Sequence, residues 1–229
     1  MFQQLHLPKV AGRLLLHSMP GCDESFVEFL AAAEAEGVET IVSLSPPDEI
    51  EAGSPDYARA IEEEDPRLPR MIAVAGRVFP HSEEETGAFY RAALLEGKKR
   101  LATGATILVH RGEDLSDAGT FAAALMGKVN LPLDQALELL ASSGAAPKTD
   151  EQLGFLRSGV DELPEKLAQV DLTGDEGNPR AVVSIAIDLA DRLGMDSDAI
   201  ARELRGAGKA QAHTRFEQHF GEYVQIWVD

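Results

Sequence analysis

Residues 106–120, with the sequence TILVHRGEDLSDAGT, decide how the rest of this chain is interpreted. The apolar run 107–109 is typical of a buried strand, and an Ala-rich helical pattern begins after a short loop that contains Gly112. A strand, a Gly-containing loop and a helix together form a cradle in which backbone N–H groups at the helix N-terminus face an anion. The stretch therefore predicts a loop of the phosphate-binding type.

Strands and helices are expected to alternate on both sides of this stretch. Apolar runs predict strands at 13–16, 40–44, 71–74 and 107–109. Capping residues and helical periodicity predict helices from Asp23 or Ser25 to 36, and at 57–64, 82–102, 118–128, 132–142 and 149–156. This alternation favours an α/β fold with three layers and a mostly parallel central sheet.

The pattern changes after a polar join that begins near Ser158. A strand is expected at 168–172, then helices at 178–193, 196–206 and 209–220, then a strand at 223–228. The two strands can pair with each other and form a small α+β (β-α-α-α-β) module. We therefore divide the chain into residues 1–157, a linker at 158–167 and a module at 168–229.

Four segments carry a resemblance to a known family. They are the loop that starts at His110 and the stretches 12–16, 37–44 and 147–152, and their order matters as much as their residues. In this order they resemble the dual-specificity and tyrosine phosphatases, whose signature is His-Cys, five residues, Arg, Ser or Thr, and Gly. The resemblance covers about residues 10–157 and implies a phosphatase-like three-layer fold.

The same resemblance implies that the phosphatase chemistry is lost. Arg111 stands at the position of the nucleophilic Cys, and Asp117 stands at the position of the phosphate-binding Arg. Gly76 stands at the position of the general acid, which is an Asp in the family. A guanidinium stays protonated and is not a nucleophile. The degenerate phosphate loop comprises His110, Arg111, Gly112, Glu113, Asp114, Leu115, Ser116 and Asp117.

Charges in this loop predict its present state. Glu113, Asp114 and Asp117 oppose a bound dianion, and a single Arg offsets only part of their charge. We therefore expect Arg111 to form a salt bridge with one of these acids, or the loop to hold water. We expect no phosphate or sulfate in it.

Composition and charge limit the remaining functions. Hydrophobic residues make up 44% of the 229 residues, which is enough for a folded core, and 39 acids against 21 bases give a net charge of −18. This charge argues against binding to nucleic acid or to an anionic membrane. No run reaches the roughly 18 apolar residues of a membrane span, so a cytoplasmic protein is expected. Cys22 is the lone cysteine, and the six histidines form no metal-ligand pattern, so neither metal nor cofactor is expected.

The sequence favours a pseudophosphatase that acts through protein contacts with unidentified partners. A repurposed hydrolase that uses the acidic loop and His110 is one alternative. An acidic decoy or inhibitor that binds a basic partner is another. The C-terminal module, with its Asp-Leu-x-Gly pattern at Asp171, resembles small uncharacterised phage and bacterial proteins, which implies nothing about its role.

Overall fold

The computed structural model describes residues 2–74, 84–112, 114–160, 169–172 and 179–227. The larger part of the fold is a five-stranded sheet with the strand order β1-β2-β5-β3-β4. β1 is antiparallel to β2, and every other neighbouring pair is parallel, so the predicted mostly parallel sheet is confirmed. The strands are β1 (Gln3–Leu5), β2 (Arg13–His17), β3 (Val38–Ser43), β4 (Arg70–Ala73) and β5 (Thr106–His110).

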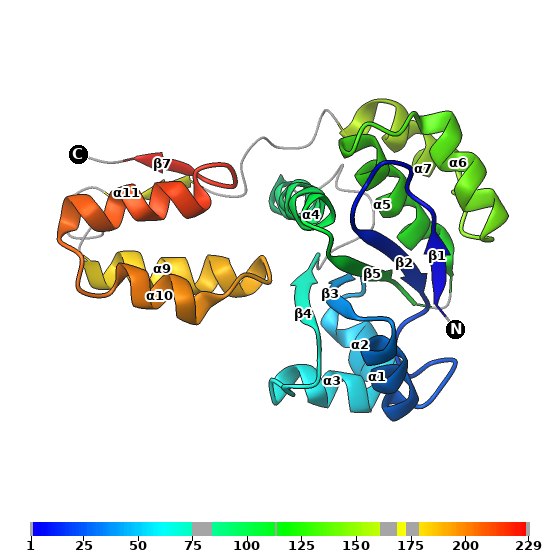
Figure 1. The fold of residues 1–229 in the computed structure, drawn as a ribbon, viewed down its shortest axis with the longest axis horizontal. Coiled ribbons are helices and arrows are strands. Elements are labelled where there is room, and N and C mark those ends of the chain that lie inside the picture. Colours follow the sequence, from blue (N-terminus) through cyan, green and yellow to red (C-terminus); the bar gives the residue numbers. More distant parts are fainter. Residues whose placement is uncertain (1, 75–83, 113, 161–168, 173–178, 228–229) are drawn as a thin grey trace.

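Helices cover both faces of this sheet, which gives the expected three layers (Figure 1). Leu15, Ile41 and Leu108 point to one face, where they pack with aromatic residues of the first helices. The helices on this face are α1 (Phe26–Ala35), α2 (Pro47–Gly53) and α3 (Pro55–Glu62). We call these three helices and the face they cover the α1–α3 face.

The opposite face holds the larger core. Leu16, Val42 and Val109 alternate with the residues above and pack against helices from the second half of the domain. These helices are α4 (Glu84–Ala102), α5 (Leu115–Lys128), α6 (Leu133–Ser142), α7 (Asp150–Gly154) and a π-helical turn, η2 (Phe155–Gly159). The fully buried strand β5 lies between β2 and β3 and so carries its carboxyl end to the middle of the sheet edge.

The C-terminal segment forms three helices and a two-stranded sheet. β6 (Gln169–Asp171) and β7 (Gln225–Trp227) pair in parallel, so the pairing of the two flanking strands predicted from sequence is confirmed. Between them lie α9 (Pro179–Arg192), α10 (Ser197–Leu204) and α11 (Lys209–Phe220). The apolar core of this module also includes Ala92 of α4, and Phe89 and Leu95 of the same helix pack against it. The module is therefore docked on α4 (Figure 1).

Two elements were missed from the sequence, and the predicted start of one helix needs correction. The strand β1 and the helix α2 were not predicted at all. α5 begins at Leu115, three residues before the predicted start at Ala118. Ser116 and Asp117, which we expected in a loop, therefore lie in the first turn of a helix. None of the helices within the described ranges is long and apolar enough to span a membrane.

Candidate functional site

The degenerate loop lies where three parallel strands end. His17 of β2 and Ser43 of β3 are both register partners of His110, the last residue of β5. The side chain of Asp114 accepts a hydrogen bond from the backbone N–H of Ser116 at 2.8 Å and so caps α5. The expected strand, loop and helix are thus present, at the carboxyl edge of a parallel sheet where α/β folds commonly place their sites.

His110 is fully buried beneath the loop. Its Nε2 lies 3.0 Å from the hydroxyl of Tyr57, and its ring meets the Tyr57 ring edge to face with a centroid separation of 5.5 Å. Burial, with a smaller contribution from nearby His17, lowers the pKa of His110 to about 3. The imidazole is therefore neutral and cannot contact a molecule in solvent. Its Nδ1 has no hydrogen-bond partner among the described residues.

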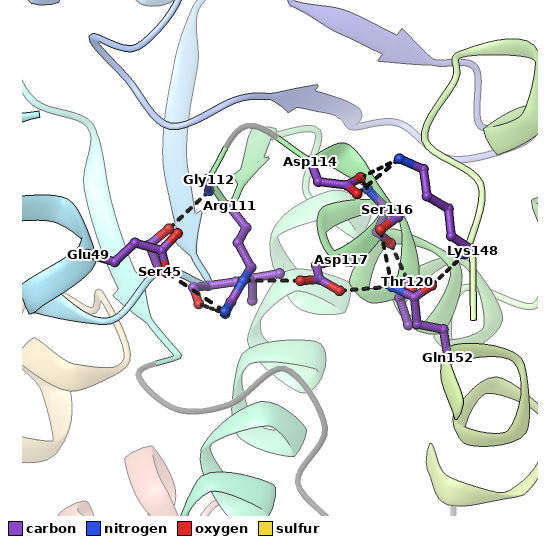
Figure 2. A network of polar contacts seen from close by, with 11 residues as sticks. Ser45, Glu49, Arg111, Gly112, Asp114, Ser116, Asp117, Thr120, Lys148 and Gln152 are labelled. Atoms are coloured by element: carbon purple, nitrogen blue, oxygen red, sulfur yellow. Dashed lines mark hydrogen bonds and ion pairs between the residues drawn. The ribbon is translucent and has the colours of Figure 1, made fainter. Parts of the chain in front are cut away.

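The side chain of Arg111 occupies the middle of the loop and binds three acceptors (Figure 2). One terminal nitrogen donates to the carbonyl oxygen of Leu44 at 2.6 Å. Nε lies 3.1 Å from Oδ2 of Asp117, and the other terminal nitrogen lies 3.7 Å from Oε2 of Glu49 in α2. The salt bridge expected between Arg111 and an acid of its own loop is confirmed, and its acid is Asp117.

Asp117 is held from its other side by Gln152. The Gln152 amide nitrogen donates to Oδ1 of Asp117 at 2.8 Å and to the hydroxyl of Ser116 at 3.2 Å. Gln152 is buried, and it also closes a capping box with Thr149 at the start of α7. One amide side chain thus caps α7 and orients Asp117 towards Arg111.

Two backbone N–H groups of the loop are already bonded to side chains. The Gly112 N–H donates to the hydroxyl of Ser45 at 3.2 Å, and the Ser116 N–H donates to Asp114. In an anion cradle these N–H groups would face the ligand. Two of the described N–H groups of the loop are therefore already committed to side chains.

The outer rim of the loop carries a second ion pair. Nζ of Lys148 lies 2.9 Å from both carboxylate oxygens of Asp114. The hydrogen bond from the Ser116 N–H, with that from Lys148, lowers the pKa of Asp114 below its usual value. This carboxylate is consequently charged at neutral pH and adds negative charge next to the first turn of α5.

The structure brings most of the predicted site residues together. Two of them lie outside the residues that the structure describes. His110, Arg111, Gly112, Ser116 and Asp117 take part in the contacts above together with Asp114, while Leu115, the first residue of α5, packs against the core. Glu113 and Gly76 lie outside the described residues. Sequence reasoning missed six contributors from other parts of the chain: Leu44, Ser45, Glu49, Tyr57, Lys148 and Gln152.

No signal in the sequence points to most of these partners, because each is more than 30 positions from the residue it contacts. Gln152 is the exception, since its capping-box position is readable. The described residues contain no group of three His, Cys, Asp or Glu side chains arranged to hold a metal ion.

Solved structures with a similar fold are dual-specificity or tyrosine phosphatase-like. Kinase associated phosphatase (KAP), in a form whose catalytic-site cysteine is replaced by serine, matches 71% of this chain and 95% of its own length, with a TM-score of 0.59 and 18% identity. PTPMT1 matches 71% of this chain and 96% of its own, with a TM-score of 0.49 and 16% identity. Human DUSP28 matches 70% of this chain and 94% of its own length, with a TM-score of 0.49 and 16% identity.

At these identities the likeness establishes the fold alone, and the KAP match carries it. The KAP match shows that the chain has a phosphatase-like α/β fold. No protein-family model and no curated protein matches the chain.

Proposed function

We propose that this protein is a pseudophosphatase, which lacks catalysis and acts by binding another protein. One observation carries the proposal. Arg111, at the nucleophile position of the resemblance, is ion-paired at 3.1 Å with Asp117, at the position of the phosphate-binding Arg. The two positions on which phosphoryl transfer depends thus hold a pair of opposite charges that neutralise each other.

The described part of the loop offers no uncommitted side chain that could replace the Cys as nucleophile. A guanidinium stays protonated in proteins and has no lone pair available for attack on phosphorus. Ser116 carries the nearest hydroxyl within the loop, but it is buried and accepts a hydrogen bond from Gln152. The cysteinyl-phosphate of the family cannot form on Arg111. The carboxylates of Asp114 and Asp117, the other nucleophile type in the loop, are held in ion pairs with Lys148 and Arg111.

Electrostatics oppose phosphate binding as well. A phosphate placed over the loop would face the carboxylates of Asp117, Asp114 and Glu49, with Arg111 already shared between two of them. At an effective dielectric constant of about 20, two like unit charges about 5 Å apart repel by about 3 kcal/mol before screening by salt. Lys148 offsets Asp114, and Arg111 offsets one of the other two acids, so the loop and its rim keep about one net negative charge, which disfavours a dianion.

The alternative of a repurposed hydrolase is disfavoured by the position of His110. A general base must lie within hydrogen-bond reach of the proton that it removes. His110 is 0% exposed and its nearest polar partner is Tyr57, so it reaches no solvent-side substrate. No described residue at the loop supplies another accessible imidazole.

The direct test is an assay of turnover with an aryl phosphate such as para-nitrophenyl phosphate. The full chain is assayed from about pH 5 to about pH 8, the range in which phosphatase general acids and bases titrate, with and without Mg²⁺ or Mn²⁺. We expect the rate of the wild-type chain to equal that of buffer and that of an Arg111→Ala variant. Metal-independent turnover that disappears in Arg111→Ala would contradict the proposal, because it would assign Arg111 a catalytic role.

A further inference from the structure

The negative charge of this chain is concentrated in one part of the fold. Residues 14–66 contain 14 Asp and Glu residues and a single Lys or Arg, Arg59, whereas the rest of the chain contains 25 acids and 20 bases. This segment forms β2, β3 and the three helices of the α1–α3 face. Most of the net charge of −18 therefore lies on and beside that face.

A groove with a volume of about 710 Å³ lies on the same face, between α2 and α3 on one side and the ends of β3 and β4 on the other. Its floor is mainly apolar and includes Ile50, Ile61 and Met71. Two exposed glutamates line it, Glu51 of α2 and Glu62 of α3. Its one basic residue, Arg59, is ion-paired with Asp56.

Ser43 gives an independent sign that the groove accepts a ligand. Its hydroxyl is buried, with the residue 1% exposed, and has no hydrogen-bond partner among the described residues. Side chains alternate along β3, so Ser43 points to the same side of the sheet as Ile41, which packs on the α1–α3 face. Ser43 is also part of the groove wall. Buried hydroxyls are rarely left unpaired, because the loss of water hydrogen bonds is then uncompensated.

The groove adjoins the degenerate loop. Ser45 lines it and accepts the N–H of Gly112, so a molecule in the groove would lie beside the Arg111–Asp117 pair. Glu49, which faces Arg111, belongs to the same helix as Glu51. Ser45 is thus shared by the loop and the groove, and α2 contributes an acid to each of them.

We propose that this groove binds a basic segment of a partner protein, which inserts one apolar side chain between α2 and α3 and places Lys or Arg beside Glu51 and Glu62. This proposal rests on the proposed function and specifies its partner. An apolar floor selects a partner with an apolar anchor, which a free polyamine lacks. The acidic rim selects basic flanks and rejects phosphopeptides and nucleic acid, because like charges repel. Ser43 supplies the hydrogen bond that fixes the orientation of the inserted residue.

Fluorescence polarisation with defined peptides tests the proposal on the full chain. The probe is a fluorescein-labelled heptapeptide with a central Leu between two runs of three Lys. One control probe has Gly in place of Leu, and another has Glu in place of every Lys. We expect saturable binding of the Leu probe at about 0.15 M salt, at least about tenfold weaker binding of the Gly probe, and no binding of the Glu probe.

Variants then locate the binding site. Ala58→Phe fills the groove without changing its charge and should abolish binding. Ser43→Ala should weaken binding about three- to tenfold. Its thermal stability should be unchanged or higher, because an unpaired buried hydroxyl is removed. Glu51→Gln with Glu62→Gln should weaken binding by about two- to fivefold for each glutamate. The matched control, Asp134→Asn with Glu138→Gln on exposed α6 positions, removes the same charge elsewhere and should change affinity little.

The proposal is overturned if the Leu and Gly probes bind with equal affinity. It is also overturned if the α2–α3 and α6 double variants lose equal affinity, because binding would then follow overall charge. Unchanged affinity in both Ser43→Ala and Ala58→Phe would overturn it as well. These results leave the turnover assay untouched, so a wrong groove and a wrong pseudophosphatase assignment are distinguishable.

Discussion

Arg111 lies at the centre of the polar contacts in the loop between β5 and α5. Its guanidinium binds the Leu44 carbonyl oxygen and two carboxylates, those of Asp117 and Glu49. An anion cradle needs an uncommitted positive site, but here the positive charge is the occupant and the acids surround it. The charges of Arg111 and of the acids around it therefore balance each other within the strand–loop–helix geometry.

The buried His110 predicts a measurable dependence of stability on pH. Its pKa is about 3 in the folded protein, against about 6.5 for an unperturbed His. Between these values the unfolded chain binds a proton that the folded chain does not, so the free energy of unfolding falls as the pH falls. For this residue alone the slope is about 1.4 kcal/mol per pH unit.

A His110→Gln variant isolates this contribution. We expect the variant to be less stable at neutral pH, because a packed ring is lost, but to lose less stability than the wild type between about pH 6.5 and about pH 5. Urea denaturation at several pH values gives both slopes. Identical slopes would mean that His110 is accessible to protons in the folded protein.

At the scale of single residues, the sequence predicted the Arg111 ion pair but not its other partners. Asp117 lies six positions after Arg111, and its charge is visible in the sequence. Ser45 and Glu49 reach the loop only because β3 lies beside β5, and a contact across a parallel sheet has no local sequence signal. Lys148 reaches Asp114 for a similar reason, through the packing of α7 against α5.

At the scale of elements, α5 depends on a glycine where it crosses another segment. A Cβ at Gly119 would lie 1.8 Å from the carbonyl oxygen of Ala145, a backbone atom that cannot move away cheaply. Gly127 lies in the same helix, and nothing lies within 4 Å of its Cβ position. Substitution at Gly119 therefore tests the packing of α5 against Ala145, and substitution at Gly127 tests helix propensity alone.

Replacing each glycine with alanine should have opposite effects. Gly119→Ala should lower the free energy of unfolding by about 3 kcal/mol or more, because the helix must shift away from Ala145. Gly127→Ala should raise it, by up to about 1 kcal/mol, through better helix propensity. Chemical denaturation measures both. A tolerated Gly119→Ala would show that α5 and the Ala145 segment are further apart than described.

Element prediction succeeded where the chain is strongly patterned and failed where it is not. The long apolar runs and capping residues located most strands and helices, including α11, whose described bounds match those expected. β1 has only three residues, two of them Gln, and it forms because β2 offers a free edge. α2 was missed because Pro46 and Pro47 also end the strand before it, although Pro is favoured in the first turn of a helix.

At the scale of the whole molecule, a buried polar cluster joins the C-terminal module to α4. The Tyr223 hydroxyl donates to Oε2 of Glu96 at 2.7 Å and accepts a hydrogen bond from Lys99 at 2.9 Å. Arg100 binds Glu96 and the carbonyl oxygen of Gly194. Burial, with the charge of Glu96, raises the pKa of Tyr223, so its hydroxyl keeps the proton that it donates. The Arg100–Glu96 pair is an i, i+4 contact within α4, but the contacts that join α4 to the module were not predictable, because they link residues 94 to 127 positions apart.

Removing one hydroxyl from this cluster should weaken the docking. Tyr223→Phe leaves the buried Glu96 carboxylate without its donor from the module, so we expect a loss of about 1–3 kcal/mol in the free energy of unfolding. The matched control is Tyr90→Phe, since the buried Tyr90 hydroxyl has no partner among the described residues. That change should be neutral or stabilising. Thermal unfolding of both variants checks the pair, and equal losses would contradict a specific role for Tyr223.

The central claim is that the loop is occupied by its own charges and binds no oxyanion. A titration of the ¹⁵N-labelled full chain with tungstate, followed by the amide signals of Gly112 and Ser116, tests this claim most directly. These N–H groups already donate to Ser45 and Asp114, and Asp117 holds Arg111, so we expect neither signal to shift at millimolar tungstate. Saturable shifts of both signals would contradict the claim and restore a phosphoryl-binding role to the loop.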